Sequence, residues 1–451
     1  MKDPILSTRL DALRDNLMLL HGVVVPAQDS PCFTVLRAGP LGEDYASSVQ
    51  NDLSTALLNE SNQHLKRLDT IKGLLVKASA EPDQQASMHL AEAWERYAEV
   101  QARCREFFGD FLMFFGGLAF RSIRVAGLED RIYRQAEALV TECAEEVTGG
   151  LRPAILPAVL ETMVRSEARV IGLRLPEWTI WSLPLVIHEL GHVLPKRINA
   201  LKEFVDNKLV GIPDEWDKWR KESYLYEIMA DVFATRLMGP AYPCALLMLG
   251  LDPLDAYTET IIRPAAAARA YVVLRSMELM DDPEAVPPLP YGDIMKILRS
   301  HWDELLKRVG GTGQVDAAYL DNLVSDLFSL LSTMAILPLL YTCAEVDRGL
   351  KAAQRWAWRW NDEWKKGLQV PPDLTATNWV RDALNAAWLC RIDHPNPDDD
   401  EKIAEAAYQL MEKLLERKQQ ASEKGRGRVR KEEGDRIKRA MQGRPHSGGT
   451  G

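Results

Sequence analysis

Apolar residues recur at three- and four-residue spacings along most of the chain, which is the pattern of helices that bury one face. The longest examples are MHLAEAWERYAEVQARCREFFGDFLMFFGGLAF (88–120) and LEDRIYRQAEALVTECAEEV (128–147). The best strand candidate is ARVIGLRLPEW (168–178), whose alternating pattern ends at Pro176. As an exposed edge of a sheet, this strand would pair with an extended peptide. The sequence therefore predicts a mainly α fold, α+β at most, with a small sheet or an edge strand.

Glycines and prolines divide this helical pattern into segments. Gly149, Gly150, Pro153 and Pro157 interrupt it and place a boundary near residue 150, and DDPEAVPPLPYGD has the composition of a linker. We therefore expect five parts: an N-terminal helical region (1–150), a central region (151–280), a Pro-rich linker (281–293), a C-terminal helical region (294–418) and a disordered basic tail (419–451).

A short helix is predicted around LVIHELGHVL (185–194). Ser182 is placed to cap its N-terminus, and Pro184 falls in the first turn, where its missing N–H costs nothing. Pro195 and the two basic residues after it predict its end.

The histidines of this helix have the spacing of a metal site. Residues four apart on a helix point the same way, with Cβ atoms about 5–6 Å apart, so His188 and His192 can bind one cation. In the H-E-x-x-H pattern two imidazoles hold Zn²⁺, and the intervening acid, here Glu189, accepts a proton from the attacking water. The alternative is a pair of satisfied core histidines, which would leave Glu189 to be explained separately.

The next predicted helix, YLYEIMADVFATRLMG (224–239), carries two acids that a cation would explain. Glu227 and Asp231 lie four apart in an otherwise apolar segment, and burying unpaired carboxylates is costly. A zinc ion bound by Glu227 would satisfy one of them. Asp231 would be satisfied by accepting a hydrogen bond from the free N–H of a ligating histidine. Glu227 is therefore the candidate third ligand, since catalytic zinc usually takes three protein ligands.

HELGH followed by EIMADVFA resembles the gluzincin metallopeptidases, the thermolysin-like clan, whose pattern is HExxH on one helix and ExxxD on the next. The resemblance covers about residues 178–280 and implies a zincin-like core built around this helix pair. It implies His188, His192 and Glu227 as zinc ligands, Glu189 as general base and Asp231 as the partner of a ligating histidine. The implied activity is hydrolysis of peptide bonds by a metal-activated water.

Two departures from the family's pattern stand out. The polar stretch 199–223 makes the gap from His192 to Glu227 longer than in thermolysin, and we expect it to form a lid or a cleft wall. In related peptidases of the membrane-associated type a His-Pro pair often precedes the next helix, whereas the matching place here reads Arg263-Pro264.

The anionic intermediate of such a reaction needs a hydrogen-bond donor. The candidates are Tyr224, Tyr226, Tyr257, Arg263 and His301, and the sequence does not choose among them. Two other functions stay open. One is a helical interaction or scaffold protein whose zinc site is structural or inactive, and the other is a zinc hydrolase with a non-peptide substrate.

Cysteine usage and the N-terminus favour a cytoplasmic location. The six cysteines lie far apart and form no C-x-x-C pair, as expected of reduced, mostly buried thiols. Charged residues occupy the N-terminus where a signal peptide has its apolar region. The uncharged stretch 327–344 approaches the length of a membrane span, but it contains Pro338, and we interpret it as a buried core helix.

The net charge of −10 is unevenly distributed. From Arg417 onward eleven Lys and Arg stand against four Asp and Glu, so this end carries +7 and residues 1–416 carry −17. We expect a solvated tail, with an acidic or nucleic-acid partner as the alternative. Trp356, Trp360 and Trp364 share one helical stripe, which we interpret as core rather than as a recognition surface.

Overall fold

The computed structural model describes part of the chain, and most of that part is helical, which confirms the prediction of a mainly α fold. The predicted tryptophan stripe, the basic tail, Pro195 and the centre of the Pro-rich linker lie outside the described residues. The described residues are 4–24, 42–122, 128–144, 154–158, 163–165, 170–174, 179–193, 198–209, 212, 216–254, 256–260, 263–281, 291–309, 313–333, 380–393 and 400–416.

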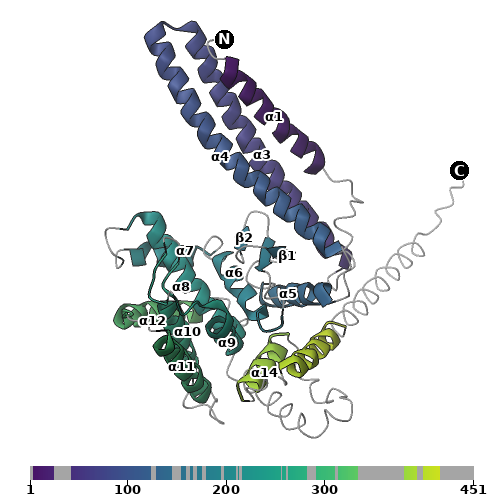
Figure 1. The fold of residues 1–451 in the computed structure, drawn as a ribbon, viewed down its shortest axis with the longest axis vertical. Helices are drawn as coiled ribbons and strands as arrows, with labels where there is room; N and C mark the ends of the chain where they lie inside the picture. Colours follow the sequence, from purple (N-terminus) through teal and green to yellow (C-terminus); the bar gives the residue numbers. More distant parts are fainter. Residues whose placement is uncertain are drawn as a thin grey trace, which may run out of the picture.

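Three long helices form an arm that projects from the rest of the molecule (Figure 1). They are α1 (Pro4–Val24), α3 (Gly42–Ala80) and α4 (Asp83–Ser122). Their apolar faces meet along the arm, where side chains such as Ile71 and Tyr97 are buried. The helix predicted over 88–120 lies within α4.

Beyond the arm, α5 (Leu128–Ala144) is followed by a three-stranded sheet. Its strands are β1 (Ala154–Ala158), β2 (Met163–Arg165) and β3 (Val170–Arg174). β1 runs parallel to β3 and β2 runs antiparallel to it, so the order across the sheet is β1-β3-β2.

The interpretation of residues 168–178 as an edge strand was wrong. β3 lies in the middle of the sheet, paired with β1 along its length and with β2 over residues 170–172, so it is not an edge strand. Among the described strands, β1 lies at the edge of the sheet. It contains Pro157, which has no N–H to donate and is tolerated where one side of a strand is unpaired. The proline that suggested an interruption thus belongs to a strand.

The motif helix begins differently from the prediction. A 3₁₀ turn, η1 (Leu183–Leu185), precedes α6 (Val186–Val193), and Pro184 does lie in the first turn. Ser182 does not cap the helix with its side chain, because its hydroxyl donates to the Thr179 carbonyl at 2.9 Å.

The polar stretch between the two motif helices contains a further helix, α7 (Asn199–Lys208). The second motif helix, α8 (Lys218–Met238), starts earlier than the predicted residue 224. Asp217 caps it, since one of its carboxylate oxygens accepts the backbone N–H of Arg220 at 2.7 Å.

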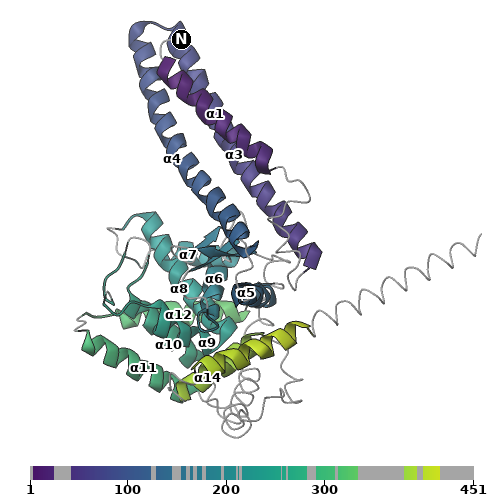
Figure 2. The ribbon, with the colours of Figure 1, turned by 45° about the vertical axis from the view of Figure 1, so that its right-hand side comes forward.

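The remaining described helices pack, directly or through one another, on the pair formed by α6 and α8 (Figure 2). Buried residues from α5 through to the helix over 400–416 form one continuous apolar core, so the core extends on both sides of the predicted boundary near residue 150. That domain boundary stays a prediction. The helices that follow α8 along the chain are α9 (Ala241–Ala245), the π-helical turn η3 (Leu246–Gly250), α10 (Ala266–Met280), α11 (Tyr291–Arg308), α12 (Ala317–Thr333), α14 (Val380–Asp393) and the helix over 400–416.

Among the described residues, no helix has both the length and the apolar character that a membrane crossing requires. The four described cysteines are buried and form no disulfide. They are Cys104, Cys143, Cys244 and Cys390.

Candidate metal centre

The two motif helices touch backbone to backbone at Gly191. A Cβ added to Gly191 would lie 2.7 Å from Cα of Ala230 and 2.9 Å from its Cβ, closer than two carbons can approach. The small residue inside H-E-L-G-H therefore lets α6 approach α8 at the level of the histidines. This approach brings His192 of α6 next to Glu227 of α8.

Two imidazoles and one carboxylate converge between these helices. The Nε2 atoms of His188 and His192 lie 3.0 Å apart. Each also lies 3.3 Å from an oxygen of Glu227, His188 from Oε2 and His192 from Oε1. His188 and Glu227 are largely buried, whereas about a quarter of the His192 side chain is exposed.

The other nitrogen of His188 faces Asp231, which is fully buried. Nδ1 of His188 lies 2.9 Å from Oδ1 of Asp231, the distance of an N–H···O⁻ hydrogen bond. If the proton is on Nδ1, the lone pair of Nε2 points towards His192 and Glu227. Asp231 therefore favours the histidine tautomer that can bind a cation through Nε2.

Tyr242, from α9, donates a further hydrogen bond to this carboxylate. Its hydroxyl donates to Oδ1 of Asp231 at 2.5 Å and lies 3.1 Å from Nδ1 of His188. The rings of Tyr242 and His188 are nearly parallel, with an interplanar angle of 6°. The tyrosine thus restrains both the carboxylate and the imidazole.

Arg269, from α10, neutralises the carboxylates from the opposite side. Its Nε donates to Oδ2 of Asp231 at 2.8 Å and a terminal nitrogen donates to Oδ1 at 2.7 Å, a bidentate pair. Its other terminal nitrogen lies 3.6 Å from Oε2 of Glu227. Four helices, α6, α8, α9 and α10, therefore supply one buried polar cluster.

The charges of this cluster displace the pKa values of its members. Burial opposes ionisation of Asp231, but Arg269 and His188 lower its pKa to about 2. Burial also opposes ionisation of Glu227, yet the two histidines and Arg269 hold its pKa well below the usual range. Burial disfavours the imidazolium of His188, but Asp231 and Glu227 raise its pKa to about 9. The carboxylates thus favour the positively charged, protonated form of His188.

Glu189 lies on the same helix, within the group of potential ligands. Ligand atoms of His188, Glu189 and His192 all lie within 4.8 Å of one another. Burial raises the pKa of Glu189, while the two histidines and Arg263 lower it. The carboxylate is therefore close enough to act on a molecule held at the imidazole nitrogens.

The arrangement fits a tetrahedral metal ion. Zn–N and Zn–O bonds of about 2.0–2.1 Å place neighbouring tetrahedral ligand atoms about 3.3–3.4 Å apart. The two Nε2 atoms lie 3.0 Å apart, and each lies 3.3 Å from a different oxygen of Glu227, so the carboxylate faces both imidazoles at a comparable distance. Oε2 of Glu227 is buried and accepts no hydrogen bond from the described residues. A cation would satisfy all three groups at once. Imidazole nitrogens with one carboxylate suit zinc better than magnesium or calcium.

The charge of Arg263, one of the five candidate donors, lowers the pKa of Glu189. Arg263 is half-buried in a turn closed by two hydrogen bonds with Thr260. Burial and the negative charges of Glu259 and Asp316 raise the pKa of Tyr224.

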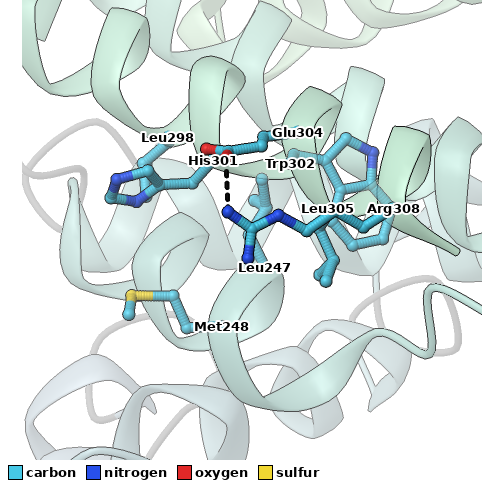
Figure 3. A pocket seen from close by; sticks show the side chains of 8 residues that line it. All are labelled: Leu247, Met248, Leu298, His301, Trp302, Glu304, Leu305 and Arg308. Carbon is cyan, nitrogen blue, oxygen red and sulfur yellow. Dashed lines mark hydrogen bonds and ion pairs between the residues drawn. The ribbon is translucent and has the colours of Figure 1, made fainter.

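The other candidates have different surroundings. Burial and the negative charges of Glu222 and Asp206 raise the pKa of Tyr226. Tyr257 packs closely against Gly313. His301, on α11, lines a cavity of about 290 Å³ beside Met248 (Figure 3), and none of the residues of the metal cluster lines it.

Two residues of the cluster were not identified from the sequence, Tyr242 and Arg269. Arg269 had a signal, because it is the single charge in the apolar run AAARAYVVL, and a buried guanidinium needs an acidic partner. Tyr242, in the short segment AYPCA, had no comparable signal.

Comparisons with known proteins add no relative. No protein-family model matches the chain, and neither any curated protein nor any solved structure matches it.

Proposed function

We propose that this chain is a zinc metallopeptidase whose metal is held by His188, His192 and Glu227. The observation that carries the proposal is the convergence of two imidazole nitrogens and one buried carboxylate at separations of 3.0, 3.3 and 3.3 Å. Bound there, zinc would supply Lewis-acid activation of a water molecule and of a substrate carbonyl.

The protein's own groups have separate roles in this proposal. Asp231 keeps the proton of His188 on Nδ1, at 2.9 Å, and so keeps Nε2 free to bind metal. Glu189, which ligates no metal in this scheme, accepts the proton of the attacking water and passes it to the leaving amine. Arg263, whose charge reaches Glu189, is the preferred donor to the anionic intermediate.

The choice of a hydrolase over a structural site rests on the role that the HExxH resemblance gives Glu189, a base rather than a fourth ligand. Structural zinc is almost always held by four protein groups, whereas catalytic zinc leaves one position for water. In the described cluster, Glu227 approaches both Nε2 atoms, and Glu189 is the neighbour left to act as a base. Peptides are proposed as substrates because of the resemblance to gluzincins.

The decisive experiment measures metal content and peptide cleavage together. Zinc is quantified in purified wild type, Glu189→Gln and Glu227→Ala, and each is incubated with a peptide library that is read by mass spectrometry. We expect about one zinc per wild-type chain, zinc retained without cleavage in Glu189→Gln, and zinc lost in Glu227→Ala. Glu401→Gln, an exposed acid on the helix over 400–416, is the matched control and should behave as wild type.

Each alternative gives a different result. A wild-type protein without zinc would contradict the proposal. Loss of zinc from Glu189→Gln would make Glu189 a fourth ligand and the site structural. Zinc retained in wild type and in Glu189→Gln, with no peptide cleaved by the wild type, would contradict the peptidase and leave an inactive zinc site or a non-peptide substrate.

A further inference from the structure

The corner between α8 and α9 leaves backbone groups that need partners. Gly239 ends α8 with φ 67° and ψ −149°, a conformation that residues with a side chain rarely adopt. The last carbonyls of a helix and the first N–H groups of the next have no partner within their own helix. At this corner they include the carbonyl of Met238 and the N–H of Ala241, both completely buried.

Asn385 of α14 satisfies both groups with one side chain, across 144 or more residues of sequence. Its Nδ2 donates to the carbonyl of Met238 at 2.6 Å and to the carbonyl of Arg381 at 3.0 Å. Its Oδ1 accepts the N–H of Ala241 at 2.8 Å. A primary amide carries both donors and an acceptor, which a carboxylate or an alkyl group does not.

Arg381 strengthens the same junction. Its guanidinium donates to the carbonyl of Leu237 at 3.2 Å, one residue before Met238. Arg381 and Asn385 lie four apart on α14 and therefore share a face. Both are buried. α14 thus holds the end of α8, the helix that carries Glu227 and Asp231.

The corner leads directly to the metal cluster. Tyr242 follows Ala241, and its hydroxyl contacts Asp231 at 2.5 Å and Nδ1 of His188 at 3.1 Å. Moving the first turn of α9 would move this hydroxyl relative to α8. The bond between Asn385 and Ala241 therefore fixes the position from which Tyr242 reaches the cluster.

We propose that Asn385 is a positioning residue of the metal centre, which acts by fixing the α8–α9 corner and, through it, Tyr242, Asp231 and His188. This inference rests on the proposed function, because the metal whose binding Asn385 supports is the one that His188, His192 and Glu227 are proposed to hold. Asn385 contacts neither metal nor substrate in this proposal. Its effect on the metal is transmitted through Ala241 and Tyr242.

The test measures zinc affinity in the folded protein, by competition with a chromophoric chelator, together with the absorption spectrum of the cobalt-substituted protein. The variants are Asn385→Leu and the milder, isosteric Asn385→Asp, which keeps an acceptor for Ala241 but cannot donate to Met238. Leu389→Ala, a buried apolar residue on the same helix, is the control for loss of stability alone.

We expect zinc affinity to fall by about tenfold or more in Asn385→Leu, the range found when partners of metal ligands are removed, and by less in Asn385→Asp. The cobalt spectrum should change in both and stay unchanged in Leu389→Ala. If Asn385→Leu does not fold, Asn385→Asp carries the test. Wild-type affinity and spectrum in a folded Asn385 variant would overturn this inference alone. A wild type that binds no zinc would overturn the proposed function and this inference with it.

Discussion

Gly191 and Ala230 set the distance between the two motif helices. A Cβ on Gly191 would lie 2.7 Å from Cα of Ala230, which is backbone and cannot rotate away. The histidines of α6 meet Glu227 of α8 because the helices touch here without an intervening side chain.

Gly191→Ala should therefore push the helices apart. We expect a loss of about 1–3 kcal/mol in the free energy of unfolding, the usual cost of overpacking a core, and weaker zinc binding. Urea unfolding and chelator competition measure the two effects. Gly73→Ala in α3 is the control, because an added Cβ meets nothing within 4 Å there. It should stabilise the protein by about 0.5–1 kcal/mol. Equal behaviour of the two variants would refute the close contact.

Tyr242→Phe removes one hydroxyl and little else. Asp231 then loses a donor at 2.5 Å and His188 a neighbour at 3.1 Å. We expect zinc affinity to fall by about 10- to 100-fold. Chelator competition measures the affinity. Tyr319→Phe serves as the control, since the buried hydroxyl of Tyr319 has no hydrogen-bond partner among the described residues. Unchanged affinity in Tyr242→Phe would separate Tyr242 from the metal centre.

Arg269→Met leaves the fully buried Asp231 without its bidentate partner. Breaking a buried ion pair typically costs about 3–5 kcal/mol, and urea unfolding should report a loss of this order. The double variant with Asp231→Asn should cost less than the sum of the single variants, because the two groups act as a unit. Arg275→Met is the control on the same helix. Its more exposed pair with Asp321 should be worth less than about 1 kcal/mol. Additive losses would contradict the pairing.

Without metal, the protein should lose stability as the pH rises from about 6.5 to 9. The pKa of His188 is raised from 6.5 to about 9 in the folded protein. The stabilisation is therefore complete below pH 6.5 and lost as the pH rises through 9, to a total of up to about 3 kcal/mol. Urea midpoints in chelator at pH 6.5, 7.5 and 9 measure the loss. Saturating zinc should abolish this decline, because a bound metal replaces the proton. A pH-independent midpoint in chelator would contradict the charge on His188.

Local spacing explains which parts of the site were visible in the sequence. His188 and His192 lie four apart, as do Glu227 and Asp231, and α-helical geometry alone puts each pair on one face. The structure brings the two pairs together as the sequence suggested, with Nδ1 of His188 at 2.9 Å from Asp231. Their roles in binding and catalysis stay predictions until metal is measured.

Long-range contacts explain what was missed. Tyr242, Arg269 and Asn385 reach the motif helices from three other helices, and no spacing in the sequence encodes those contacts. The prediction that residues 168–178 form an edge strand was wrong for the same reason. The sequence of β1, which pairs with β3, contains Pro157 and did not resemble a strand. The prediction that Ser182 caps the motif helix was wrong for a local reason, since its hydroxyl donates to the Thr179 carbonyl ahead of the 3₁₀ turn.

The hydrogen bonds from Asn385 to the α8–α9 corner also limit which fragments of the chain can fold by themselves. A fragment ending at residue 280 would contain every proposed zinc ligand, yet it would expose the part of the core that α11, α12 and α14 cover and would leave Met238 and Ala241 without their partner. The smallest stable unit for expression and crystallisation should therefore run from α5 at least through α14, whatever role the helical arm has.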